Sequence, residues 1–221
     1  MSKHDYDDYE EKENEFEVIV DKISPYKDTN INPHNGKSIS KLVYSPNMKY
    51  VATISDNDNS IVVWKINDEH SELEPVCTRF LGSYIKNQWT LSGVLDYKYV
   101  LLQKSRGKAY DFEIIDIQTG SEQILKAQSL TGAVDGASFL ENGDVVMVKG
   151  EPSYRAYIFS KPDFNSGHQW RHKGSIEINK YHKYVISRKG KLLILLDVPS
   201  VIMQWDLETL KFEAQYLEEE T

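Results

Sequence analysis

The sequence contains a single cysteine, Cys77, and no Asn-x-Ser/Thr triplet. One cysteine cannot form an intrachain disulfide, so the disulfide-rich class of secreted domains is excluded. The amino terminus also lacks the short apolar segment that a signal peptide needs. These absences predict an intracellular chain, and we expect the cytoplasm to be its compartment.

Long apolar runs are missing as well. The longest one, residues 192–196, is far shorter than the roughly 20 residues required to span a bilayer, so we expect no membrane span within this chain. Apolar residues nevertheless make up 40% of the 221 residues, which is enough to bury a substantial core in one domain or at most two.

Positive charge is scarce. The formal net charge is −8, and it comes from the two ends: residues 1–21 hold nine acidic residues against two lysines, and residues 218–221 hold three glutamates. The part between them is close to neutral, so no nucleic-acid partner is expected, because such binding needs a concentrated basic face. Dense like charge and low hydrophobicity predict a disordered tail over residues 1–14, with a second acidic tail at 218–221.

No constellation of catalytic or metal-binding residues stands out. His168 and His172 have the i, i+4 spacing of a helical zinc pair, but Gly167 and Gly174 flank them and no third ligand accompanies them. A catalytic zinc site needs three protein ligands and a structural one needs four. Cys77 lies in a strand-like pattern, where a small buried hydrophobe is expected. The sequence therefore predicts no enzyme activity, no metal and no cofactor.

What the sequence does contain is a β-hairpin pattern at residues 45–66. Residues 50–55 and 61–66 each alternate between two sets of side chains rich in β-branched and aromatic residues, which is typical of strands. Residues 56–60 between them are short and polar, and such side chains bond to their own backbone in tight turns.

This hairpin resembles the end of a WD repeat. Asp58 lies in the turn, Ser60 follows it and Trp64 comes next, in the order of that motif. Lys65 stands where the family usually has Asp, and His34 has the place of the His that opens many such repeats.

Three further units follow the first at spacings of 49, 46 and 47 residues. Trp64 of the first unit corresponds to Ile115, Phe159 and Trp205 in the others, and the fourth unit ends on the WD dipeptide itself, Trp205-Asp206. The units extend over about residues 34–80, 84–126, 132–162 and 174–217, within a propeller domain at 15–217.

The same order of short strands recurs in each unit, with turn signals between them and no helical pattern of ten residues. This rhythm predicts an all-β fold of four-stranded antiparallel sheets, each of them one blade of a WD-type β-propeller of about four blades. Residues 16–21 read as one more strand, and in propellers of this type the first strand often completes the last blade.

The number of blades bears on the partners. Four units lie at the lower edge of the ~4–8 blades of propellers, so the ring is either small and closed or incomplete. Because a blade buries its faces only against neighbouring blades, an incomplete ring would expose an apolar sheet face and lead to self-association, or would need further blades from a longer chain.

One set of loop residues is a candidate partner face. It consists of Lys104, Arg106 and Lys108 from the turn between the second and third strands of the second unit, and of Trp170, Arg171, His172 and Lys173 from a predicted loop between blades. The WD resemblance implies that these two loops share one face of the propeller. An exposed Trp170 beside Arg171 would be an interface anchor, whereas the alternative is that Trp170 folds onto its own blade.

The resemblance implies a non-enzymatic scaffold that binds protein partners through loops held on a rigid platform. Two alternatives stay open. In one, the chain is the cytosolic amino-terminal propeller portion of a larger ion-transport membrane protein; in the other, it is a fragment of a longer WD-repeat protein. A propeller hydrolase is disfavoured, because its site would need acid, base or metal-binding residues near the channel.

Overall fold

The computed structural model describes residues 32–67, 72–81, 89–106, 109–125, 134–162, 169–196 and 201–217. The tails predicted at 1–14 and 218–221 and the strand predicted at 16–21 lie outside these residues, as does His168. No helix in the part of the chain that the structure describes is long and apolar enough to cross a membrane.

The described residues form one short 3-10 turn, η1 (Pro33–Gly36), and sixteen β-strands that make four antiparallel sheets. The first sheet contains β1 (Lys41–Tyr44), β2 (Tyr50–Ser55), β3 (Ser60–Asn67) and β4 (Glu72–Phe80). The second contains β5 (Trp89–Leu95), β6 (Tyr99–Arg106), β7 (Ala109–Asp116) and β8 (Glu122–Leu125). The third contains β9 (Val134–Phe139), β10 (Val145–Lys149), β11 (Arg155–Ser160) and β12 (Arg171–Glu177). The fourth contains β13 (Lys183–Ile186), β14 (Lys191–Leu196), β15 (Val201–Asp206) and β16 (Lys211–Leu217).

Each sheet is a simple meander, since its four strands pair in chain order. The prediction of an all-β fold with four-stranded antiparallel sheets is therefore confirmed. One strand was not foreseen: β12 is the fourth strand of the third sheet, so the third unit continues to Glu177 instead of ending near residue 162, and the fourth begins later than residue 174.

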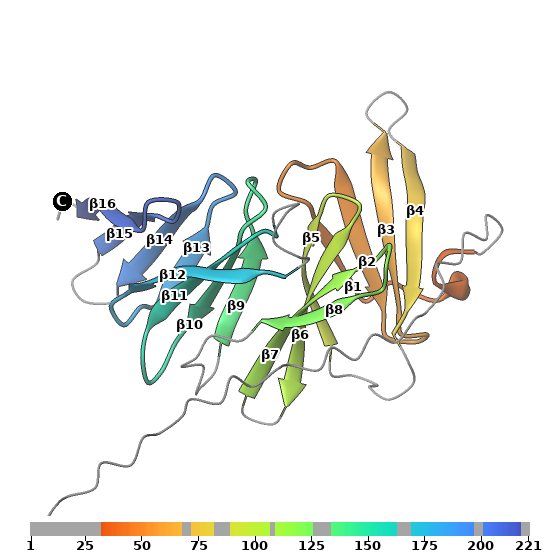
Figure 1. The fold of residues 1–221 in the computed structure, drawn as a ribbon, viewed down its shortest axis with the longest axis horizontal. Coiled ribbons are helices and arrows are strands. Elements are labelled where there is room, and N and C mark those ends of the chain that lie inside the picture. The colour runs from red at the N-terminus through yellow and green to blue at the C-terminus, as the bar shows by residue number, and fades with distance from the viewer. Residues whose placement is uncertain are drawn as a thin grey trace, which may run out of the picture.

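The sheets stand face to face in chain order, from the first at the right of Figure 1 to the fourth at the left. Their cores lie between neighbouring sheets. In β6, Val100 and Leu102 belong to the cluster shared with the first sheet, whereas Tyr99 and Leu101 belong to the cluster shared with the third. This alternation is the period of two that a strand buried on both faces requires.

Three such cores occur in the described residues, and each joins consecutive sheets. No core cluster of these residues joins the first sheet to the fourth, and the two lie at opposite ends of the row in Figure 1. The described sheets thus form an open row in which each end sheet has one face without a neighbouring sheet.

Candidate functional site

A chain of hydrogen-bonded side chains, buried at its centre and half-buried at both ends, crosses the outward face of the first sheet. His34 is held in η1 in a left-handed conformation with φ 55° and is only 2% exposed. Its Nδ1 lies 2.6 Å from Ser60 Oγ and its Nε2 lies 2.7 Å from Thr53 Oγ1. Trp64 Nε1 donates to Thr53 Oγ1 at 2.7 Å, and Ser60 Oγ donates to Asp58 Oδ1 at 2.6 Å.

The chemistry of the two ends fixes the direction of this chain. An indole N–H can only donate, and a carboxylate can only accept. Because Ser60 gives its proton to Asp58, it accepts from the Nδ1–H of His34, and Nε2 of the neutral ring then accepts from the Thr53 hydroxyl. Along this path the donors point from Trp64 toward Asp58, an arrangement in which successive hydrogen bonds strengthen one another. The Thr53 hydroxyl also lies 3.3 Å from the Val62 carbonyl oxygen, a second acceptor for its proton.

Electrostatics agrees with a neutral imidazole. Burial lowers the pKa of His34 below its ordinary value, and the nearby Asp58 carboxylate only partly opposes that shift. Asp58 is held in place by the Ser60 backbone N–H at 3.1 Å and by Asn35 Nδ2 at 3.2 Å. The predicted residues His34, Asp58, Ser60 and Trp64 are thus brought together, and Thr53, which sequence reasoning missed, connects two of them.

The other sheets lack this network. The pairing registers give four residues the same position in their sheets: Trp64, Ile115, Phe159 and Trp205. In the same order, they lie opposite Val51, Val100, Val145 and Leu192. Two residues after those, Thr53 is replaced by the apolar Leu102, Met147 and Ile194. Without that hydroxyl no indole-to-imidazole connection can form, so the polar chain is a feature of the first sheet.

Charge pairs connect strands in the other three sheets. Asp206 accepts from the backbone N–H groups of Glu208 and Thr209 and binds Lys191 Nζ at 2.7 Å. The hydrogen bond from Lys191 is the main reason that the pKa of Asp206 is held well below its usual range. Asp206 of the WD dipeptide therefore closes the β15–β16 turn onto β14.

Asp116 of the second sheet does the same in its own turn. Its Oδ1 accepts from the Gln118 and Thr119 N–H groups, and its Oδ2 lies 3.5 Å from Lys98 Nζ. In the third sheet the acid is on the other strand: Asp144 precedes β10 and binds Lys173 Nζ of β12 at 3.1 Å. These carboxylates are accounted for by the architecture of their sheets.

Trp170 is buried, with 5% of its surface exposed. Its ring packs between the second and third sheets against Tyr99 and Phe139, with centroid distances of 5.7 and 5.6 Å. Its backbone makes two hydrogen bonds to the side chain of Gln123 on β8, at 2.7 and 2.9 Å. Trp170 is therefore a core residue between two sheets and not an exposed anchor.

The rest of the candidate partner face is divided between two ends of the sheets. Arg171, His172 and Lys173 begin β12, just after the β11–β12 connection. Lys161 in that connection pairs with Asp96 of the β5–β6 turn at 3.8 Å, which puts both segments at one end of the strands. Lys104 and Arg106 lie toward the opposite end of β6, and Lys108 lies outside the described residues. The two groups therefore lie at opposite ends of the strands and do not share one face. Residues 171–173 were expected in a loop between blades, but they begin the strand β12.

Tyrosines gather at the junction of the third and fourth sheets. Tyr181 donates to Asp135, and its ring packs edge-on against Tyr154 and Tyr184, both at 5.4 Å between centroids. Burial raises the pKa of Tyr184 to about 12. A Cβ at Gly136 would collide with the Tyr184 hydroxyl, so a larger residue there would displace the Tyr184 ring.

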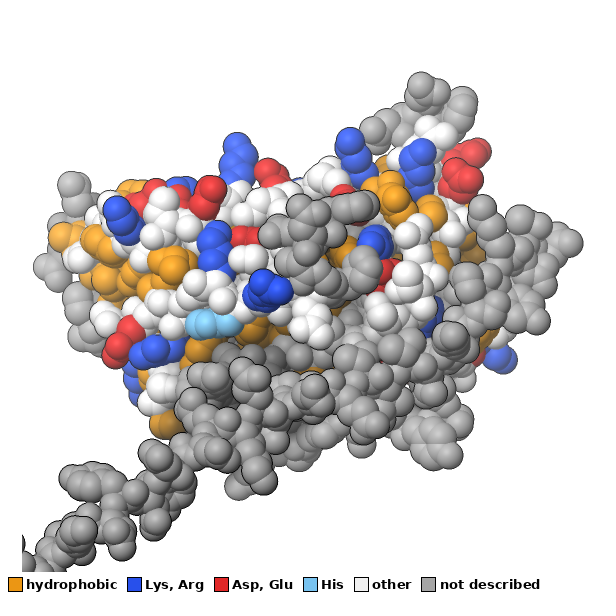
Figure 2. All heavy atoms as spheres, in the orientation of Figure 1, with side chains coloured by type: hydrophobic (Ala, Val, Ile, Leu, Met, Phe, Trp, Pro, Cys, Tyr) orange, Lys and Arg blue, Asp and Glu red, His pale blue; other side chains and the backbone are white. Residues whose placement is uncertain are grey.

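The open face of the fourth sheet carries several exposed apolar side chains. Val185 lies opposite Leu193, and Ile202 lies opposite both Leu195 and Tyr216, so these side chains share the face. Val185 is 60% exposed, Ile202 39% and Tyr216 50%. Figure 2 shows hydrophobic side chains gathered at the end of the molecule where this sheet lies.

The matching face of the third sheet shows what this surface lacks. Ala156 and Ile202 are equivalent, each three residues before the Trp64 position, and Ala156 lies opposite Val148 and Ile176. Those three residues are buried in the core shared with the fourth sheet. The fourth sheet therefore presents the same kind of face with no sheet on it.

The outward face of the first sheet is the counterpart. Tyr44 lies opposite Val51 and Leu42 opposite Thr53, and both Tyr44 and Leu42 are half-exposed. Their equivalents in the fourth sheet, Ile186 and Tyr184, pack onto the third sheet. The two end sheets thus carry the two complementary halves of an inter-sheet junction, of which the first sheet exposes Leu42 and Tyr44 but not Val51 and Thr53.

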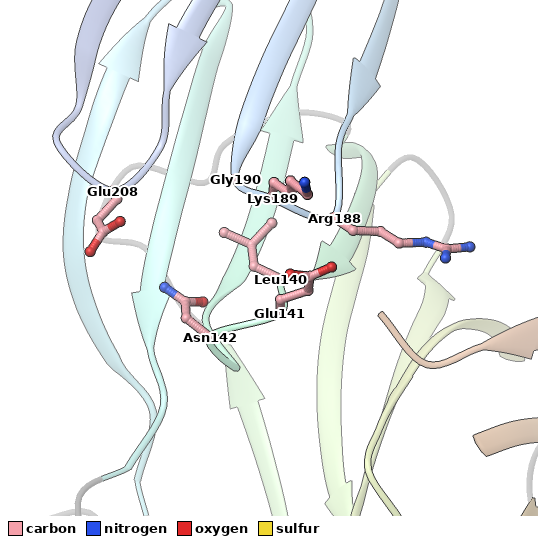
Figure 3. A pocket seen from close by; sticks show the side chains of 7 residues that line it. All are labelled: Leu140, Glu141, Asn142, Arg188, Lys189, Gly190 and Glu208. Atoms are coloured by element: carbon pink, nitrogen blue, oxygen red, sulfur yellow. The ribbon is translucent and has the colours of Figure 1, made fainter. Parts of the chain in front are cut away.

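A hollow of about 210 Å³ lies where three turns meet, lined by Leu140, Glu141, Asn142, Arg188, Lys189, Gly190 and Glu208. Figure 3 shows Leu140 pointing into it and Arg188 extending away from it. Its volume is below the ~300–1,000 Å³ of small-molecule sites. Its polar groups come with both signs of charge and do not converge on one point, so it does not resemble a catalytic pocket.

The two side chains that sequence reasoning considered as reactive or metal-binding, Cys77 and His172, are packed against other residues. Burial raises the pKa of the Cys77 thiol, which therefore stays protonated, and His172 packs against the rings of Tyr157 and Phe159. Within the described ranges no group of three His, Cys, Asp or Glu side chains could hold a metal ion.

No family model and no curated protein matches the sequence. The structure is similar to Hsv2 from Kluyvelomyces marxianus, with a TM-score of 0.53 and 11% identity over 78% of this chain and 50% of that one. KlHsv2 with its loop 6CD replaced by a Gly-Ser linker gives a TM-score of 0.54 at 12% identity, over 81% and 52%.

The fold is a β-propeller. Another similar structure, the dihydro-heme d1 dehydrogenase NirN in complex with DHE, has a TM-score of 0.51 and 14% identity over 82% of this chain and 38% of that one. The chain spans about half or less of the length of these structures. At such identities the likeness concerns the fold alone, so the similarity to an enzyme and to WD-type proteins does not assign a function.

Proposed function

We propose that this chain is a non-enzymatic protein-interaction scaffold whose main binding surface is the open face of the fourth sheet. The observation that carries the proposal is the exposure of Ile202 and Tyr216, because their equivalents in the third sheet, Ala156 and Ile176, are buried. Soluble monomers rarely leave a contiguous apolar surface of this kind uncovered, and such surfaces mark interaction sites.

The chemistry of the face fits a protein and not a small molecule. It is a sheet surface in which aliphatic side chains and Tyr216 lie beside the polar Gln204 and Lys183. The charges of Lys191, Asp206 and Glu213 lie at one edge. Protein interfaces likewise combine apolar contacts with polar and charged groups toward their edge. The fold supplies the rigid support, while the binding energy comes from the few apolar residues at the centre.

The test is site-specific photo-crosslinking in cells. A photoreactive phenylalanine analogue is placed at Ile202 in one sample and at Ile124 of β8 in another, because both side chains are 39% exposed on strands. We expect a discrete protein adduct at position 202, none at position 124, and loss of the adduct when Val185→Lys is added. Absence of any adduct at position 202 would show that the face is not a binding surface.

A further inference from the structure

We infer that the partner of this face is a second copy of the same chain, joined head to tail so that two open rows close into one ring of eight sheets. This inference rests on the proposed function, since it names the protein that covers the fourth sheet. The open face of the fourth sheet in one copy would pack on the outward face of the first sheet in the other, and the same contact would form again at the opposite side.

Complementarity of the two faces is the first argument. At each of the three junctions within the chain, the same two types of sheet face meet. The first type is the face of the third sheet that carries Val146 and Val148, and the second type is the face of the fourth sheet that carries Leu192 and Ile194. The fourth sheet carries the first type on its open side, through Leu193 and Leu195. The first sheet carries the second type on its outward side, where Leu42 and Tyr44 are half-exposed while Val51 and Thr53 are buried. A junction between copies would therefore repeat the rule of the internal junctions.

Within the described residues, the first and fourth sheets do not cover each other. The first and fourth sheets stand at opposite ends of the row in Figure 1, with the second and third sheets between them. In this part of the chain no further sheet packs on the open face of either one. A repeated head-to-tail contact closes into a ring when its rotation permits, and eight blades are within the ~4–8 of known propellers.

The area of contact favours closure over a single junction. With four strands about 4.8 Å apart and about six residues rising 3.3 Å each, one sheet face covers roughly 400 Å². A single junction then buries roughly 800 Å² in total, which is the size of a crystal contact, whereas two junctions bury roughly 1,600 Å², which is a standard stable interface. Contact between two fourth sheets would give only one junction and would leave both first sheets uncovered.

The experiment is the molar mass of the purified chain by light scattering across a dilution series. We expect twice the chain mass of 25.5 kDa for the wild type. Ile202→Lys and Leu42→Lys are each expected to give a monomer, because each blocks one half of both junctions. Ile124→Lys, at matched exposure, is expected to keep the dimer. Far-UV circular dichroism shows that each variant is folded, and the exposed starting positions make this the expected result.

The other outcomes contradict the inference in distinct ways. A wild-type monomer would overturn it, and if an adduct with another protein still forms at position 202 the proposed function stands. A dimer that survives Leu42→Lys but not Ile202→Lys would show that two fourth sheets meet. Masses that keep rising with concentration would show an open polymer in place of a closed ring.

Discussion

At the scale of single residues, Thr53 shows how one hydroxyl connects side chains that are 19 and 11 positions away in sequence. The motif in the sequence pointed to His34, Asp58, Ser60 and Trp64 but not to Thr53, because a threonine inside a strand pattern looks like an ordinary β-branched residue. Its role depends on facing the same side as Trp64, and that is decided by the register of β2 and β3.

We expect Thr53→Val to destabilise the fold by about 2 kcal/mol or more, because the Trp64 indole N–H and the His34 ring would lose their buried partner. The measurement is the free energy of unfolding from urea denaturation. Thr78→Val is the matched control, since Thr78 is a half-buried strand threonine of the same sheet and its hydroxyl makes no hydrogen bond in the described part of the chain. Equal losses in the two variants would contradict the role assigned to Thr53.

At the scale of elements, the charge pair of the fourth sheet makes the β15–β16 turn sensitive to acid. The pKa of Asp206 is lowered in the folded chain, chiefly by Lys191, so its contribution to stability is present above the ordinary carboxyl pKa of about 3.9. That contribution is lost as the pH falls from there toward the lower folded value. Glu213, whose pKa Lys191 also lowers, acts in the same direction.

Asp206→Asn is therefore expected to be less stable than the wild type at pH 7, with a difference that shrinks as the pH falls below about 4. Urea denaturation at pH 7 and at pH 3 measures both differences. Asp56→Asn, a change in the exposed β2–β3 turn, is the control and should show little effect at either pH. A difference that is the same at both values would mean that the Lys191 contact does not depend on the charge of Asp206.

Strand patterns predicted most elements, and turn lengths explain where the prediction failed. An offset of 95 residues aligns Tyr50 with Val145, but Val145 is the counterpart of Val51 in the pairing register. The cause is the turn before β2, which closes from Ser45 to Tyr50 and is one residue longer than the turn from Leu140 to Asp144. A slip of one residue moves a side chain to the other face of a sheet.

The position of Trp170 could not be predicted for a related reason. Residues 171–177 lack a continuous apolar run, since β12 is an outer strand with five side chains that are exposed or half-buried. The segment therefore resembled a loop, and the basic residues next to Trp170 suggested a surface. Only the contacts with Tyr99 and Phe139, which lie far away in sequence, show that the ring is buried between two sheets.

At the scale of the whole molecule, stability should be highest in the middle of the row. The second and third sheets have cores on both faces, whereas the first and fourth have a neighbouring sheet on one face only. In repeat architectures the stability is approximately a sum of terms within units and between neighbours, so an end unit lacks one neighbour term. Amide hydrogen exchange reports these local stabilities strand by strand.

We therefore expect the slowest exchange in β6 and β10 and faster exchange in β2 and β14 when the chain is dilute. Raising the concentration should slow exchange in β2 and β14 together, since each copy would then cover the first sheet of the other while its own fourth sheet is covered. The monomeric variant Ile202→Lys should show the fast pattern at every concentration, and Ile124→Lys should follow the wild type. Slowing in β14 alone would mean that the ring does not close, because a closed ring buries both ends of the row at once.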